Sequence, residues 1–166
     1  MNEQINKVQA EVVADSTALV EVARDNGFNA ITVSELINPA ETAMYCSIKD
    51  DGSMKSKAAI FNTVNSPDKK LSECIGDVIA LRNIVAHPIT LLDENTGEMI
   101  EALRVVLVDD KGFSYEAVSN GVANAVSRIL QIFGQPETWA EPVKVKAIQK
   151  QTRNGNNKVT TLKIEM

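Results

Sequence analysis

Two stretches of alternating apolar and polar residues lie in the last part of the chain. Residues 142–153 and 158–166 both alternate, and Asn154-Gly155 lies between them. The side chains of a strand point to its two faces in turn, and Asn-Gly tolerates the positive φ angles that a tight turn requires. The pattern therefore predicts a β-hairpin over residues 142–166.

Three more β-forming stretches come before this hairpin. Residues 77–92 are long and apolar, residues 99–108 alternate, and residues 113–118 form a third, shorter stretch. Polar turns that contain glycine separate them at residues 93–97 and 109–112, and such turns are typical connections between strands. The pattern predicts a three-stranded meander.

A helix is predicted between the meander and the hairpin. Ser119 can accept a hydrogen bond at its start, and Gly134 stands where a helix ends. The apolar residues between them fall on one helical face: Val122, Val126, Ile129, Leu130 and Phe133. Three strands, a helix and two strands are the element order of the OB-fold, a five-stranded barrel, and we expect a mainly β, OB-like (α+β) fold. An α+β sheet packed on one helix would produce the same order.

Residues 1–42 have a different character and are expected to form an acidic, helical N-terminal appendage. Apolar spacing predicts a helix up to about residue 25. Six acids against two bases give residues 1–40 a charge of −4, while the whole chain carries −5. We therefore divide the chain into this appendage and an OB-like domain over residues 43–166.

Two short elements are expected at the start of that domain. Residues 43–49 alternate as a strand does. Residues 56–65 resemble a helix, whose inward residues would be Ala59, Ile60 and Val64. Leu71 and Ile75 are expected to anchor the next turn on the core.

Composition places the chain among globular proteins. Of its 166 residues 44% are hydrophobic and 23% are charged. It has no stretch of about 18 apolar residues and no signal peptide, so we expect a soluble, cytoplasmic protein without membrane contact. Cys46 and Cys74 do not form a CxxC pair and are expected to be free thiols.

The residues that catalysis would need are scarce. The only histidine, His87, precedes a proline and cannot form a cluster of histidines, so a half-buried strand position is the simpler interpretation. The acidic turns at 93–98 and 109–110 could bind a hard cation but show no EF-hand spacing. Phosphate-binding and nucleophile motifs are absent. We expect no enzyme, no cofactor and no metal.

Nucleic-acid binding fits the pattern better. Single strands are bound by a cationic groove with aromatic rings on which bases stack. The hairpin segment 141–166 carries six bases against two acids, a net charge of +4. The candidate binding residues are Arg104, Phe113, Tyr115, Lys144, Lys146, Lys150, Arg153, Lys158 and Lys163.

Each kind of candidate has a structural alternative. Arg104 is expected to neighbour Tyr115 on the adjoining strand, but Phe113 and Tyr115 could equally lie on the core face. An alternating cationic face can serve solubility alone. Trp139, between two prolines, is expected to pack over one end of the barrel.

Several segments, in order, resemble the small single-stranded DNA-binding proteins of tailed phages that infect Gram-positive bacteria. They are residues 55–65, 85–98, 102–107 and 151–157, and the resemblance covers about residues 43–166. The family implies an OB-type barrel that binds and protects single-stranded DNA without strong sequence preference. It also implies a role in phage DNA replication or recombination in the infected cell. It supplies no contact residues.

Two functions therefore remain open. The first is single-stranded DNA binding, in which the basic turn at 152–157 binds the strand and the acidic turn at 93–98 stays off the phosphates. The second is an OB-like protein-interaction module that recruits replication partners through its N-terminal helix. Residues 1–40 could also form a homo-oligomer under either interpretation.

Overall fold

The fold is given by a computed structural model, which describes residues 44–166. The helix and the appendage expected over residues 1–42 lie outside the described residues. The chain divides into two compact units: Pro88–Ala102 belongs to one, and Met44–His87 with Leu103–Met166 forms the other. The candidate site lies in the second unit.

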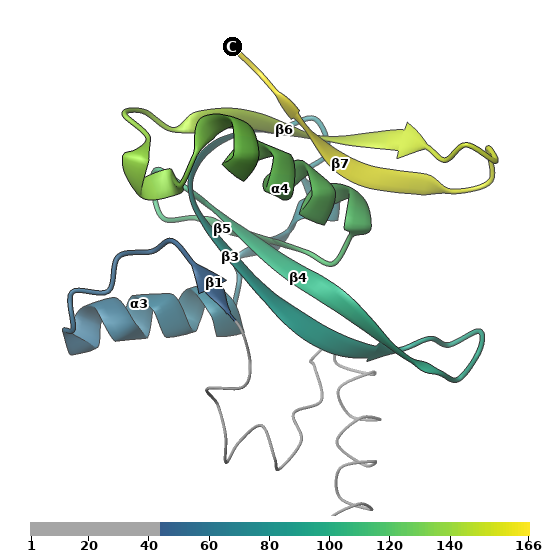
Figure 1. Ribbon diagram of the computed structural model, residues 1–166, viewed down its shortest axis with the longest axis horizontal. Helices are drawn as coiled ribbons and strands as arrows, with labels where there is room; N and C mark the ends of the chain where they lie inside the picture. The colour runs from purple at the N-terminus through teal and green to yellow at the C-terminus, as the bar shows by residue number, and fades with distance from the viewer. Residues whose placement is uncertain (1–43) are drawn as a thin grey trace, which may run out of the picture. The chain divides into compact units, whose positions relative to one another are not determined.

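The element order contains the expected meander, helix and hairpin (Figure 1). The strands are β1 (Tyr45–Cys46), β2 (Lys69–Lys70), β3 (Val78–Leu92), β4 (Met99–Asp109), β5 (Ser114–Ala117), β6 (Val143–Gln151) and β7 (Lys158–Ile164). The helices are α3 (Met54–Asn65) and α4 (Asn120–Phe133), with short 3-10 turns η2 (Leu71–Glu73) and η3 (Pro136–Thr138). Among the described helices none is long and apolar enough to cross a membrane.

The strands form one sheet in the order β2-β5-β4-β3-β6-β7, and β1 pairs with β3. The first meander strand thus lies between the second meander strand and the closing hairpin. This mainly β arrangement is consistent with an OB-like α+β fold. The expected count of five strands was wrong: the sheet has seven, because two strands of two residues each join it. β2 pairs in parallel with β5, with Lys69 opposite Tyr115, a distant contact that no local pattern encodes.

The closing hairpin is confirmed. β6 and β7 pair antiparallel, with Val145 opposite Ile164 and Gln151 opposite Lys158. In the turn, the Thr152 N–H donates to the carbonyl oxygen of Asn157 over 2.8 Å. Gly155 has a φ of 71°, which is the positive angle that the Asn-Gly dipeptide predicted.

The main core lies between α4 and one face of the sheet. Val122, Val126 and Ile129 are buried on α4, and they join Leu81 and Val145 from the sheet in one cluster. The start of α4 packs directly on β7. The Ser119 hydroxyl, expected to cap the helix, instead donates to the carbonyl oxygen of Thr160 over 2.9 Å. That prediction was wrong because β7 offers the hydroxyl an acceptor.

α3 and β1 cover part of the opposite face. Val85, Val106 and Val108 are buried there, and Cys46, Ile48 and Val64 pack against them. α3 begins at Met54 rather than Ser56, because the Ser53 side chain caps it by accepting from the Ser56 N–H.

Two inward positions expected in this region were wrong. Ala59 is exposed, since α3 buries no residue completely. Ile75 is 38% exposed, whereas Leu71 is fully buried. α3 therefore contacts the sheet along a narrow strip of side chains that includes Val64.

Strand β3 changes the face that it buries. Leu81 and Ile84 are three residues apart, yet both are buried in the main cluster, and Val85 belongs to the opposite one. Strict alternation would place Leu81 and Ile84 on different faces. The interruption shifts the alternation by one residue, so that Ile84 and Ala86 continue the α4 side that Ile79 and Leu81 begin.

Candidate nucleic-acid interface

Four lysines share the outer face of the closing hairpin, away from α4. Lys146 stands directly opposite Lys163, and Lys144 and Lys150 follow the same alternation on β6. Between these lysines Val145 and Ala147 point to the core and are fully buried. The expected division into an apolar and a cationic side is confirmed. We call Lys144, Lys146, Lys150 and Lys163 the cationic face.

One acid interrupts the cationic face. The Oε1 atom of Glu165 lies 3.3 Å from Lys146 Nζ and 3.4 Å from Lys163 Nζ. Hydrogen bonding from Lys146 and the nearby lysine charges hold the pKa of the Glu165 carboxyl below its usual value. Among the described residues, neither Lys144 nor Lys150 forms an ion pair. The face keeps a net positive charge.

The hairpin turn adds cations at its tip. Arg153 and Lys158 are exposed, and no acid lies between Gln149 and Leu162. Lys158 stands opposite Gln151, so by alternation it points to the other side of the hairpin from Lys150. The tip therefore presents positive charge on both sides.

Arg104 lies outside the cationic face, on the α3 side of strand β4. Tyr115 pairs with Leu107, on the core face of β4, whereas Arg104 points to the α3 side. Its Nε and Nη2 donate to Glu116 Oε2 over 3.0 and 2.7 Å, and its Nη1 donates to the carbonyl oxygen of Val64 over 2.8 Å. The expected neighbourhood with Tyr115 was wrong, because the two side chains point to opposite faces. Through these contacts Arg104, on β4, connects that strand to β5 and to α3.

The aromatic pair lies at the edge of the sheet. The rings of Phe113 and Tyr115 are 5.7 Å apart, and Lys69 Nζ lies 5.6 Å from the centre of the Phe113 ring. Tyr115 packs partly against the core. Its burial, and to a smaller extent the charge of Asp109, raises the pKa of its hydroxyl. Phe113 is 41% exposed and keeps a free surface. Tyr115 therefore packs on the core side, as the structural alternative predicted, whereas stacking of a base on Phe113 stays a prediction.

Lys69 was not predicted from the sequence as a neighbour of the aromatic pair. It joins Phe113 only because β2 pairs with β5, which lies more than 40 residues further along the chain. Two adjacent lysines after a proline and an aspartate give no local signal of a strand.

His87 and Trp139 have structural positions. His87 is half buried, and its Nδ1 has no hydrogen-bond partner. Burial and the charge of Arg104 lower its pKa. Trp139 is buried, and its Nε1 is shared between the carbonyl oxygens of Phe133 and Gly134, over 3.1 and 3.0 Å. Both expectations, a half-buried strand histidine and a packed tryptophan, are confirmed.

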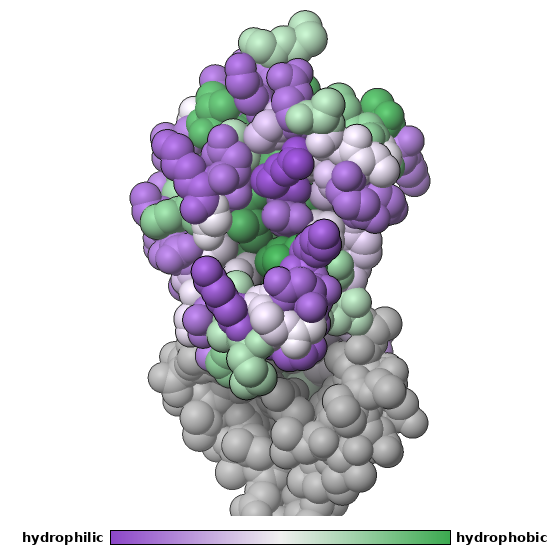
Figure 2. Space-filling view, turned by 90° about the vertical axis from the view of Figure 1, so that its left-hand side faces the viewer, coloured by the Kyte–Doolittle hydropathy of each residue, from purple (hydrophilic) through white to green (hydrophobic). Residues whose placement is uncertain are grey.

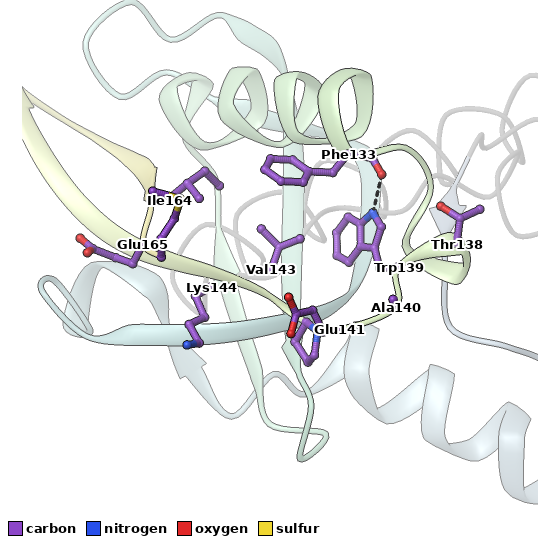
Figure 3. Close-up of a pocket in the computed structure, with 11 residues that line it drawn as sticks. Phe133, Thr138, Trp139, Ala140, Glu141, Val143, Lys144, Ile164 and Glu165 are labelled. Atoms are coloured by element: carbon purple, nitrogen blue, oxygen red, sulfur yellow. Dashed lines mark hydrogen bonds between the residues drawn. The ribbon is translucent and has the colours of Figure 1, made fainter.

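A groove of about 600 Å³ lies at the root of the hairpin, between the end of α4 and the outer ends of β6 and β7 (Figure 3). Phe133, Val143 and Ile164 form its apolar part, and Glu141 and Glu165 lie on its rim. In the space-filling view, apolar residues show in a central hollow and as small separate areas at the surface rather than as one broad patch (Figure 2). Lys144 of the cationic face lines the same groove, so the groove borders the root of that face.

The position of α3 bears on where a nucleic acid could lie. OB-folds commonly bind single strands on the face of their second and third strands, and β4 and β5 are the second and third strands of the meander here. On the outer side of these strands, Val106 and Val108 are buried beneath α3 and β1. By contrast, the outer side of β3 next to the hairpin is open, and Val78 is 53% exposed. The open outer surface is therefore that of β3, β6 and β7.

The sequence model of the phage single-stranded DNA-binding protein family, of the phi29 type, matches residues 40–165. This match spans most of the chain. The chain belongs to this family. Searches of curated proteins and of solved structures gave no significant match. The resemblance noted from the sequence is confirmed, and membership of a phage DNA-binding family supports a binding protein rather than an enzyme.

Proposed function

We propose that this phage single-stranded DNA-binding protein coats single-stranded DNA without strong sequence preference, during phage DNA replication or recombination in the host cytoplasm. The observation that carries the proposal is the cationic face on an uncovered part of an OB-like sheet. Four lysines there share one side of a rigid antiparallel ladder. Fixed cations on a ladder can follow a sugar–phosphate backbone without contacting base edges, so they carry no sequence preference.

In this proposal the phosphates follow the outer side of β6 and β7 and continue to the hairpin turn. Lys144, Lys146 and Lys163 bind near the root, and Lys150, Arg153 and Lys158 bind towards the tip. Phe113 lies at the other end of the strand order, beside β2 and β5, so it adds a stacking surface for a strand that continues beyond the cationic face. In this proposal Arg104 stabilises the fold and does not bind DNA, because its guanidinium group already donates hydrogen bonds to Glu116 and to the Val64 carbonyl oxygen.

An oligonucleotide titration tests the proposal. Labelled oligo-dT should bind at low salt, and Lys144→Gln combined with Lys163→Gln should weaken binding about tenfold or more, because each lost phosphate contact removes counterion release. Lys55→Gln combined with Lys111→Gln is the matched control, since it removes two exposed lysines that lie outside the hairpin. Absence of binding by the unaltered protein at low salt would disprove the function. Equal losses in both variants would disprove the location.

The roles proposed for residues 1–42 need a separate test. We propose that residues 43–166 form the DNA-binding domain and that residues 1–40 serve self-association or partner recruitment. A chain that begins at residue 44 should bind oligo-dT with nearly unchanged affinity and lose self-association in sedimentation. Loss of DNA binding in a folded, shortened chain would contradict this division.

A further inference from the structure

The pairing of Glu165 with two lysines points to one particular position on the cationic face. The same oxygen, Oε1, lies between the ammonium groups of Lys146 and Lys163, at 3.3 and 3.4 Å. Two ammonium groups on adjacent strands form a site for one oxyanion, and a phosphate oxygen could take the same place. The carboxylate stands there in the unbound protein.

The ladder fixes this arrangement. Lys146 and Lys163 are directly opposite each other in the sheet. The Glu165 N–H donates to the carbonyl oxygen of Lys144 over 2.9 Å, so its backbone belongs to the same ladder. The carboxylate therefore starts from a position beside both lysines and needs only its short side chain to reach them.

The geometry points to Glu165 as an internal competitor of DNA: its carboxylate occupies a phosphate position between Lys146 and Lys163 and lowers the affinity for single strands. This inference rests on the proposed function. A phosphate at that position must displace the carboxylate, and part of the free energy of the new contacts is then offset by the loss of the old ones. A protein that coats single strands must also release them. The Glu165 carboxylate weakens the contact with phosphate at this one position, while both lysines stay in place.

Glu165→Gln tests the inference because glutamine keeps the size of the side chain and removes its charge. Oligo-dT affinity at low salt should rise about two- to fivefold, the range expected for loss of one exposed ion pair. Glu141→Gln is the matched control. It removes the same charge near the start of β6, where Glu141 forms no ion pair with the hairpin lysines. It should change affinity much less.

A double-mutant cycle makes the test specific. Lys146→Gln should lower affinity only modestly in the unaltered protein, because Glu165 already neutralises part of the charge of Lys146. It should cost more in the Glu165→Gln background, where that lysine is free for phosphate. If Glu165→Gln is no tighter than Glu141→Gln, or is weaker, the inference is wrong.

Two outcomes separate the inference from the proposed function. If the unaltered protein fails to bind oligo-dT at low salt, the function itself is wrong, whatever the variants do. If it binds and the cycle shows no coupling, only the role of Glu165 fails. Glu165→Thr serves as a second neutral variant, and thermal melting of each variant checks that the hairpin remains folded.

Discussion

Gly121 is where the α4 helix meets strand β7 most closely. A Cβ atom at this position would overlap the carbonyl oxygen of Thr160 and come within 2.6 Å of Val159 Cγ1. The Thr161 hydroxyl also donates to the Gly121 carbonyl oxygen over 3.1 Å, and Ser119 bonds the same strand. The glycine is therefore required by close approach of two backbones, although its position in a helix costs some stability.

We expect Gly121→Ala to lower the free energy of unfolding by about 1–3 kcal/mol, as overpacking of a well-fitted contact does. Urea unfolding measures the effect. Ser127→Ala, at an exposed position of the same helix, is the control and should be neutral or slightly stabilising, because alanine favours the helix. A Gly121→Ala protein as stable as the control would show that the helix can move away from β7.

His87 gives the fold a pH dependence of known sign. Burial and Arg104 lower its pKa below the ordinary value of 6.5. Below pH 6.5 His87 takes up a proton more readily in the unfolded chain than in the folded one. The free energy of unfolding that His87 contributes is therefore fully present above about pH 6.5 and is lost as the pH falls. Urea midpoints at pH 7.5 and 5.5 should therefore differ.

The His87→Gln variant should show a smaller difference between these two pH values. His87 is the only histidine of the chain, so no other imidazole contributes in this range. An unchanged difference in the variant would assign the pH dependence to carboxylates instead.

At the scale of elements, Arg104 connects three of them. Its side chain and that of Glu116 are 16% and 27% exposed, so this ion pair is partly shielded from water. We expect Arg104→Met to lower the free energy of unfolding by about 1–3 kcal/mol, because Glu116 and the Val64 carbonyl lose their donor. Hydrogen exchange should become faster in α3.

The same variant checks the assignment of Arg104 to structure. Its affinity for oligo-dT should stay within about twofold of the unaltered protein wherever the variant is folded. A large loss of affinity with no loss of stability would return Arg104 to the DNA-binding residues.

The hairpin turn should contribute to binding as a unit. Replacing Lys150, Arg153 and Lys158 by glutamine removes three cations that have no ion pair among the described residues. Each lost phosphate contact should make the slope of log affinity against log salt shallower by about 0.7 on single strands. Fluorescence titrations over a salt series measure it. A slope equal to that of the unaltered protein would show that the turn stays off the phosphates.

Elements with their own periodic pattern could be predicted, and those made by distant pairing could not. The closing hairpin and α4 have alternation or helical spacing together with turn or terminator residues, and their positions were confirmed. β2 has two residues and exists only through its pairing with β5. β1 lies within the strand predicted over residues 43–49, although pairing with β3 limits it to two residues. Alternation within β4 places Arg104 on the face of Val106 and Val108. The sequence could not give the register with β5, which sets Glu116 on the same face as Arg104 and Tyr115 on the other.

At the scale of the whole molecule, charge is segregated. The chain carries −5 in total, while the hairpin segment 141–166 carries +4. Most of the surface should therefore repel DNA, and binding should depend on a few localised contacts. The sequence predicted this segregation, because charge is additive along a chain. It could not predict the pairing of Glu165 with two lysines, which requires the sheet register.

We expect a slope of log affinity against log salt of about −3 to −4 for the unaltered protein, as four to six phosphate contacts on a single strand would produce. Titrations between low and moderate salt, with the anion held constant, measure it. A slope near zero would show that stacking on Phe113 and similar contacts, rather than phosphates, provides the affinity.

The narrow cover formed by α3 and β1 limits where the chain can be shortened. A protein that begins at residue 44 keeps Cys46, Ile48 and Val64 over the buried valines of the sheet. A protein that begins at residue 67 would leave Val85, Val106 and Val108 in water on neighbouring strands. A flat apolar sheet surface of this kind promotes association between molecules. The shorter protein should therefore aggregate on expression, even though every lysine of the cationic face is still present.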